Sequence, residues 1–276
     1  MGRERALVLG GGGLAGIGWQ TGVLFGLAES GVDVTTPVDL VVGTSAGSTV
    51  GAQLGAALPL AELYARQVDP ARQNPELSPT GASVEELLAT MAKFAEETPD
   101  PVELRRRIGE LALGAATPTE AARRAVIEAR LPRHEWPGWA LSVVAVDAYT
   151  GETAVFDRDS GVGLVDAVAA SCAVPGVWPP VSIGSTRYVD GGVRAFTNVD
   201  LAADYGRVLV VAPMVEPAFA EQLAELSGRV VVIQPDGEAV AAFGTDVLDP
   251  AVRAPAATAG RAQGAREAAA VAGLWR

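Results

Sequence analysis

The sequence predicts an α/β fold in which helices pack on a mainly parallel β-sheet. Two early segments support this prediction, because each runs from a short apolar strand through a glycine-rich turn into a helix. The first joins a strand at 5–9 to a helix at 17–29, and the second joins a strand at 38–43 to a helix at 45–57. Strands that alternate with helices in this way are typical of parallel sheets.

The rest of the chain extends this pattern, and we expect its 276 residues to form a single domain, 1–276. Apolar runs predict further strands at 141–147, 153–156, 187–189, 208–213 and 229–234. Helical patterns predict helices at 162–172, at 218–226 and, near the C-terminus, at about 251–275.

The middle of the chain, about 60–130, has a different character. It is charged, has helical periodicity and is interrupted by prolines. Ser83, Asp100 and Thr119 are suitable residues to begin helices. We therefore expect a helical insertion here, and its position in the chain suggests that it can cover a site.

Composition limits the classes of partner and location. The net charge of −12 argues against a nucleic-acid partner, since phosphate binding needs a basic face. We interpret the arginines at 105–107 and at 123–124 as solvated faces of helices. Cys172 is the one cysteine, so no intramolecular disulfide can form, and glycines throughout 6–28 argue against a spanning helix. These features favour a cytoplasmic protein, with peripheral or transient contact with a membrane surface left open.

A candidate nucleophile lies at the join of the second strand and helix. Ser45 is flanked by Gly43 and Gly47 in the pattern G-x-S-x-G. A serine on such a sharp turn exposes its hydroxyl, and the helix N-terminus beneath it favours developing negative charge. The alternative is a structural glycine turn, and the position directly after an apolar strand favours the catalytic interpretation.

The glycine run at 10–16 also lies between a strand and a helix. Its bare N–H groups can hold an anion, either the oxyanion of an acyl-transfer reaction or the pyrophosphate of a dinucleotide. The dinucleotide interpretation needs an acidic residue at the end of the next strand. Asp33 has the required distance but follows no clear strand, so the oxyanion interpretation fits better.

A base for Ser45 is less obvious, because the sequence has one histidine. His134 lies between two prolines, where a surface loop is expected, and the order Ser45, His134, Asp190 differs from that of α/β-hydrolases. A carboxylate can replace histidine, and Asp190 follows a short strand and precedes Gly191 and Gly192. From spacing alone, a catalytic aspartate and a structural Asp-Gly turn are equally supported.

Taken together, these elements resemble the patatin-like phospholipase family. The resemblance rests on the glycine run that ends at Gly16, the Ser45 turn, and Asp190-Gly191-Gly192, in the family's order. The segments 170–175 and 179–181, Asp147 with 150–151, and Asn198 also look like family segments. The resemblance covers roughly residues 5–215.

The resemblance implies a three-layer α/β/α fold with a mainly parallel central sheet and hydrolysis of lipid acyl esters by a Ser45–Asp190 dyad. It implies that Gly11, Gly12 and Gly13 form a backbone oxyanion hole and that the reaction needs no metal or organic cofactor. The expected partner is a lipid or small ester substrate. Many members carry a basic residue where this chain has Ala15, which puts a phosphate-recognising role of that position in doubt.

Two alternatives remain open at this stage. One is a lipid- or acyl-binding protein of the same fold with little turnover, against which the presence of both Ser45 and Asp190 argues. The other is a nucleotide-dependent oxidoreductase that uses the glycines of 11–16.

Overall fold

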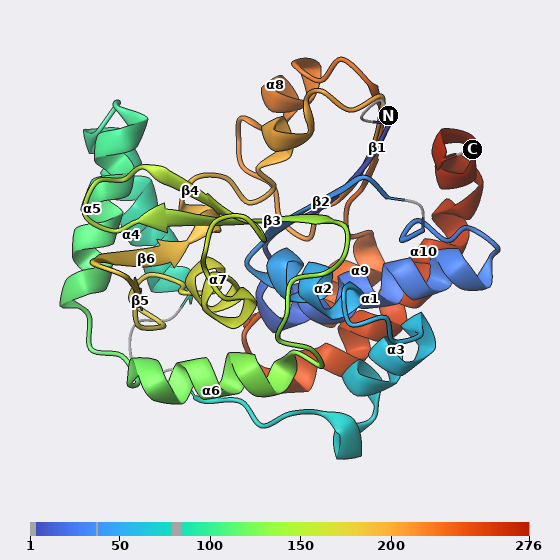
Figure 1. Cartoon of the computed structure of the whole chain (residues 1–276), viewed down its shortest axis with the longest axis horizontal. Helices are drawn as coiled ribbons and strands as arrows, with labels where there is room; N and C mark the ends of the chain where they lie inside the picture. The colour runs from blue at the N-terminus through green and yellow to red at the C-terminus, as the bar shows by residue number, and fades with distance from the viewer. Residues whose placement is uncertain (1–3, 37, 79–83, 276) are drawn as a thin grey trace.

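The computed structural model describes residues 4–36, 38–78 and 84–275, and these form a sheet covered by helices on both faces (Figure 1). The sheet has eight strands in the described part of the chain, in the order β5-β6-β3-β2-β1-β7-β8, with β4 also paired to β3. They are β1 Arg5–Leu9, β2 Leu40–Thr44, β3 Ala140–Asp147, β4 Thr153–Phe156, β5 Val181–Ile183, β6 Thr186–Asp190, β7 Arg207–Val211 and β8 Arg229–Ile233.

Five neighbouring strands, β3, β2, β1, β7 and β8, pair in parallel. At one edge of the sheet, β4, β5 and β6 pair antiparallel. This confirms the predicted α/β fold with a mainly parallel central sheet. The ten described α-helices are α1 Gly13–Glu29, α2 Ala46–Leu54, α3 Leu60–Val68, α4 Val84–Glu97, α5 Pro101–Gly114, α6 Glu120–Arg130, α7 Leu164–Ser171, α8 Phe219–Ala224, α9 Gly237–Phe243 and α10 Arg253–Trp275.

The alternation of side chains along the strands divides the core into two layers. In β1, Leu7 and Leu9 face the larger layer, where they pack with residues of α1, α2, α7 and α10. Val8 faces the opposite layer, which is covered by α8 and the short helix Val199–Ala202. Both faces of the central strands are therefore buried, as expected of a parallel sheet.

Helices α1 and α10 lie side by side and touch through glycines (Figure 1). A Cβ added at Gly22 would collide with the carbonyl oxygen of Ala257, and one at Gly260 would collide with that of Trp19. The glycines that argued against a membrane helix thus allow two backbones to pack in direct contact. No helix in the described residues is long and apolar enough to cross a bilayer.

The predicted elements differ from the observed ones mainly at their ends. The first helix begins at Gly13 instead of residue 17, and the second ends at Leu54. Asp100 and Thr119 cap α5 and α6 as expected, through bonds from Glu103 N (2.8 Å) and Ala122 N (3.3 Å). Ser83 lies outside the described residues. Strand β5 and helix α9 were not expected.

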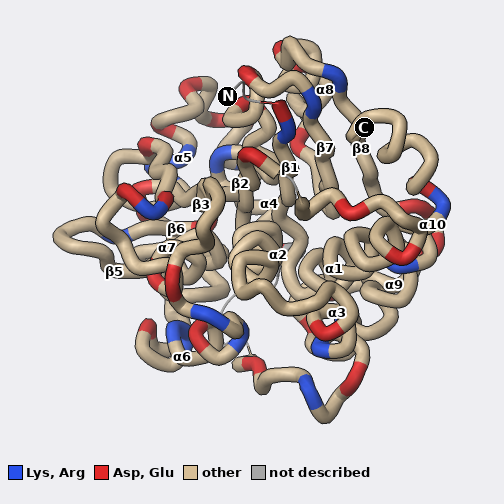
Figure 2. The backbone as a smooth tube through the Cα atoms, turned by 45° about the vertical axis from the view of Figure 1, so that its right-hand side comes forward, with Lys and Arg blue, Asp and Glu red and all other residues tan. Residues whose placement is uncertain are grey.

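Charged residues are sparse along the central strands and frequent on the outer helices and loops (Figure 2). The interpretation of residues 123–124 as a solvated face is wrong for Arg123, which is 5% exposed. Arg124 does lie at the surface, where it pairs with Asp166 and Glu128.

Candidate active site

Ser45 lies on a sharp turn between β2 and α2. Its backbone has φ 51° and ψ −112°, a conformation that is sparsely populated for a residue with a side chain. Such a turn after a parallel strand has the geometry of a nucleophile elbow, in which a serine hydroxyl projects from the sheet edge. The sequence prediction of this turn agrees with the observed geometry.

The glycines around Ser45 are required by space. A Cβ at Gly43 would lie 2.6 Å from the Cα of Ser48, and one at Gly47 would collide with the carbonyl oxygen of Leu9. Gly47 also donates its N–H to the carbonyl of Gly10 at 3.1 Å. The serine turn and the glycine loop after β1 are therefore packed directly against each other.

The register of the sheet brings Asp190 towards Ser45. Thr44 in β2 lies opposite Val144 in β3, and Asp190 in β6 lies opposite Ala145 on the other side of β3. Two strand spacings of about 4.8 Å separate these backbones. Ser45 and Asp190 line the same cavity.

Asp190 is a buried carboxylate with incomplete hydrogen bonding. Its Oδ1 accepts from the Gly192 N–H at 2.7 Å, while Oδ2 has no partner at hydrogen-bonding geometry among the described residues. Burial raises the pKa of Asp190 to about 7, against the opposing effects of the Gly192 N–H and the Ser45 hydroxyl. A carboxylate with this pKa can exchange a proton near neutral pH.

Gly191 and Gly192 permit this arrangement. A Cβ at Gly191 would collide with the carbonyl oxygen of Val144, and one at Gly192 would lie 3.0 Å from Asp190 Oδ1. The chain continues as a short 3-10 helix, Gly191–Val193, instead of the hairpin turn considered from the sequence.

The glycine loop lies beside the serine turn, and its N–H groups differ in availability. Gly11 donates to the carbonyl of Phe196 at 2.7 Å, so this conformation does not offer it to a ligand. The N–H groups of Gly12 and Gly13 make no hydrogen bond to another described residue. Gly16 packs close to Ala46, and buried Ala15 donates to the carbonyl of Val247.

Two buried side chains hold the site together that the sequence analysis did not single out for this role. Ser171 Oγ accepts from the Ser45 N–H at 2.9 Å. Asn198 donates to the Thr44 hydroxyl at 2.9 Å and to the Ala195 carbonyl at 2.7 Å. Both lie in or near segments that looked like family segments, which was the available signal, but only the fold reveals their partners.

The cavity at Ser45 has a volume of about 80 Å³ and apolar walls. Leu87 and Met91 of α4 form one wall, and Val247 and Leu248, which precede α10, form another. A larger open hollow of about 780 Å³ lies beside α1 and α3, but neither Ser45, Asp190 nor the glycine loop lines it. Ligand cavities usually measure about 300–1,000 Å³, so the Ser45 cavity is closed to a long acyl chain as it stands.

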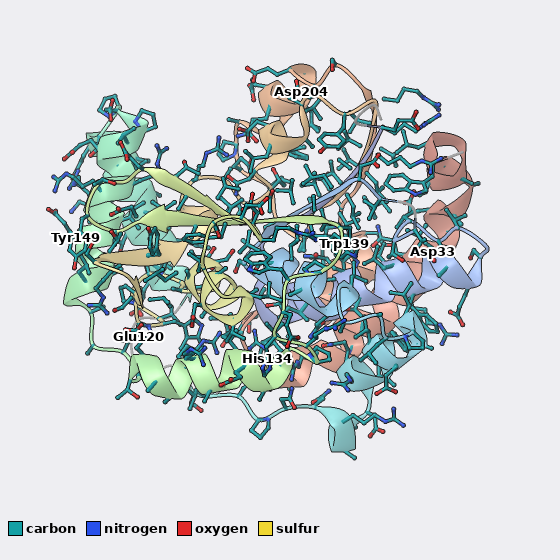
Figure 3. All side chains as sticks on the ribbon, viewed as in Figure 1. Asp33, Glu120, His134, Trp139, Tyr149 and Asp204 are labelled. Atoms are coloured by element: carbon teal, nitrogen blue, oxygen red, sulfur yellow. The ribbon has the colours of Figure 1, made fainter. Side chains whose placement is uncertain are left out.

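His134 and Asp33 do not line the Ser45 cavity. The His134 ring contacts the Glu128 carbonyl at 3.1 Å on the loop after α6, with 47% of its side chain exposed (Figure 3). Asp33 closes a local turn with Thr35 before β2, instead of standing at the carboxyl end of that strand (Figure 3). This geometry does not support a histidine base or a dinucleotide site.

Among the described residues, no group of three or more His, Cys, Asp or Glu side chains is arranged to hold a metal ion.

The patatin-like phospholipase family model matches residues 7–203. The chain belongs to this family. Membership supports a lipid acyl hydrolase function, and the match includes the Ser45 turn and Asp190.

Solved structures extend the comparison to the fold. VipD from Legionella pneumophila is 14% identical, with a TM-score of 0.52 over 97% of this chain and 67% of that chain, which supports a shared patatin-like fold. The type III effector ExoU is 16% identical, with a TM-score of 0.43 over 98% of this chain and 53% of its own. ExoU in complex with SpcU, from Pseudomonas aeruginosa, is 17% identical, with a TM-score of 0.43 over all of this chain and 52% of that chain. This chain thus spans about half the length of the ExoU chains.

Proposed function

We propose that this protein is a serine acyl hydrolase that cleaves lipid carboxylic esters with Ser45 as nucleophile and Asp190 as base. The observation that carries the proposal is the placement of both residues on one cavity, with Oδ2 of the buried Asp190 unpartnered among the described residues. Family membership supports the same chemistry.

In the proposed reaction, Ser45 Oγ attacks the ester carbonyl carbon while Asp190 accepts the hydroxyl proton. The tetrahedral intermediate collapses, and the leaving alcohol takes the proton from Asp190. A water molecule then gives a proton to Asp190 and attacks the acyl-serine ester. The acid is released and Ser45 regains its proton.

The carbonyl oxygen gains negative charge during both attacks, and we assign its stabilisation to the N–H groups of Gly12 and Gly13. The supporting observation is that these donors line the Ser45 cavity and have no other partner among the described residues. Loss of one such donor typically lowers the rate about 100- to 1,000-fold.

Substrate entry requires the cavity to widen. We propose that α4 acts as a lid, because Leu87, Leu88 and Met91 line the cavity while this helix packs mainly on α5, another helix of the insertion. The expected substrate is an ester with an apolar acyl group, which matches the apolar walls.

Hydrolysis of p-nitrophenyl esters of increasing acyl length, measured for the wild type and Ser45→Ala, tests the proposal. We expect activity that disappears with Ser45→Ala, together with covalent labelling of the wild type by a fluorophosphonate. Activity that persists in Ser45→Ala would show that the nucleophile is wrong. A wild type that binds lipid but neither reacts with the probe nor hydrolyses esters would favour the lipid-binding alternative.

A further inference from the structure

Three buried arginines converge on one glutamate beside the candidate active site. Arg130 Nη2 lies 2.6 Å from Glu76 Oε1, Arg123 Nη1 lies 3.3 Å from Glu76 Oε2, and Arg253 Nη2 lies 4.0 Å from Glu76 Oε1. Between 3% and 6% of each of these four side chains is exposed. We name these residues the arginine cluster.

The arginine cluster has three positive charges and one negative charge. No other carboxylate of the described residues lies within 4.0 Å of its guanidinium groups. The Nε atoms of all three arginines are buried without a hydrogen-bond partner in the described chain. Burial lowers the pKa of Arg123 to about 10, still well above neutral pH, so its charge is retained. Buried charges without a counter-charge destabilise a fold, and a bound anion would offset that cost.

The cluster borders the catalytic cavity. Arg123, Arg130 and Glu76 line a small hollow of about 20 Å³ whose walls also include Ser45, Gly13 and Leu248. These last three residues also line the larger cavity at Ser45. The positive charge of Arg123 lowers the pKa of Asp190, which reflects the same proximity.

Glu76 and the three arginines lie on different kinds of secondary structure. Arg123 and Arg130 project from α6, and Arg253 begins α10, whereas Glu76 lies in the irregular segment 73–78. Arg123 is further fixed by its guanidinium, which stacks 3.9 Å from the centre of the Trp178 ring. The cations are therefore carried by helices, whereas the carboxylate is carried by an irregular segment.

We propose that the arginine cluster is a binding site for a phosphate group, and that Glu76 occupies this site in the absence of ligand as an internal counter-ion. Guanidinium groups present paired N–H donors that match phosphate oxygens. Withdrawal of the Glu76 carboxylate enlarges the 20 Å³ hollow and leaves three cations for the anion. A phosphate held here lies next to the Ser45 cavity, so on the proposed function it positions an acyl ester of the same molecule.

Binding to the full chain carrying Ser45→Ala tests this site without dependence on hydrolysis. Calorimetric titration would compare three probes: monomeric dihexanoylphosphatidylglycerol, dihexanoylglycerol and inorganic phosphate. Glu76→Gln keeps the side-chain shape and removes the competing charge, so we expect the Kd of the phosphate-bearing lipid to fall about tenfold. Arg130→Gln removes one cation and should raise the Kd of the phosphate-bearing lipid about tenfold. The Kd of dihexanoylglycerol should change less than twofold.

Glu62→Gln is the matched control, because Glu62 also pairs with two arginines, Arg66 and Arg72, but at the surface. It should leave every Kd unchanged. If Arg130→Gln does not fold, Arg130→Lys retains a charge while losing the paired donors, and it should weaken phosphate-lipid binding.

The inorganic phosphate titration identifies the source of the anion. If Glu76→Gln binds inorganic phosphate more tightly than the wild type does, the site is assigned to a free anion. If only the phospholipid binds more tightly, the site is assigned to a lipid head group. Either result supports the site. The site would be overturned if both Glu76→Gln and the Arg130 variant left the affinities for inorganic phosphate and for the phospholipid unchanged relative to that for dihexanoylglycerol. Loss of ester hydrolysis with Ser45→Ala is a separate measurement, so the two proposals fail independently.

Discussion

The side-chain amide of Asn198 donates a hydrogen bond of 2.9 Å to the hydroxyl of Thr44, the residue that precedes Ser45. Asn198 itself lies eight positions after Asp190 and adopts a left-handed backbone conformation, φ 51° and ψ 39°. It thus ties the end of β2 to the segment that follows Asp190. Its buried amide has no access to water, so each lost bond leaves a partner unsatisfied.

Asn198→Ala is expected to displace the turn that carries Ser45, the proposed nucleophile. We expect kcat to fall at least about tenfold and the free energy of unfolding to fall by about 2–3 kcal/mol, because a buried acceptor is orphaned and the left-handed conformation loses its preferred residue. Ester hydrolysis and urea unfolding measure these effects. An unchanged kcat with reduced stability would assign Asn198 a purely structural role.

The pH dependence of hydrolysis follows from Asp190. The aspartate must be ionised to accept the Ser45 proton, and burial raises its pKa to about 7. We therefore expect kcat/KM to rise as pH increases through about 7 and to level off above it. A rate that is constant from pH 5 to 9 would exclude Asp190 as the base.

The contribution of Asp190 to folding stability should change with pH in the opposite direction to its contribution to activity. The folded-state pKa of Asp190 lies above its unfolded value, so the folded protein binds more protons between about pH 4 and 7, and stability falls as pH rises across that window. Asp190→Asn cannot ionise, so the variant does not lose stability in this way as pH rises. We expect the variant to lack activity yet unfold at a higher temperature than the wild type at pH 8. A variant less stable than the wild type at pH 8 would contradict the buried-charge explanation.

The contact between α1 and α10 gives a stability prediction with an internal control. Gly260→Ala places a methyl group against the Trp19 carbonyl, and we expect it to cost about 1–3 kcal/mol through overpacking. Gly273 lies on the same helix with open space around it, so Gly273→Ala should be neutral or stabilise by up to about 1 kcal/mol. Thermal unfolding of the two variants should separate them, and equal melting temperatures would refute the close packing.

Helix α4 is expected to set the acyl-length preference. Leu87→Ala enlarges the cavity at Ser45 and should shift the preferred p-nitrophenyl ester towards longer chains, while Glu96→Ala, on an exposed position of the same helix, should not. The ratio of kcat/KM for long and short esters measures the shift. An identical length profile for wild type and Leu87→Ala would remove α4 from substrate selection.

The sequence predicted local features well because local physics determines them. The Ser45 turn was predictable since a strand, flanking glycines and a helix leave few other conformations, and Asp100 and Thr119 begin helices through bonds to their own neighbours. His134 was recognised as a loop residue from its prolines. The antiparallel strand β5 was not predicted, because three residues are too few to show the alternation of apolar and polar residues that identifies a strand.

Features that depend on distant segments were not predictable. The burial of Arg123 against Trp178 and its convergence with Arg253 on Glu76 join segments far apart in the chain, which no spacing in the sequence encodes. In the same way, the bond from Gly11 to Phe196 removes one donor that the motif alone offered to the oxyanion.

The glycine contact between α1 and α10 also joins two segments that are synthesised at different times. The whole family-matched region, 7–203, leaves the ribosome before α10 is made. Before α10 packs against it, we expect one side of α1 to present bare backbone and apolar neighbours to water. We therefore expect the nascent chain to pass through an interval of exposed apolar surface, a condition that favours self-association.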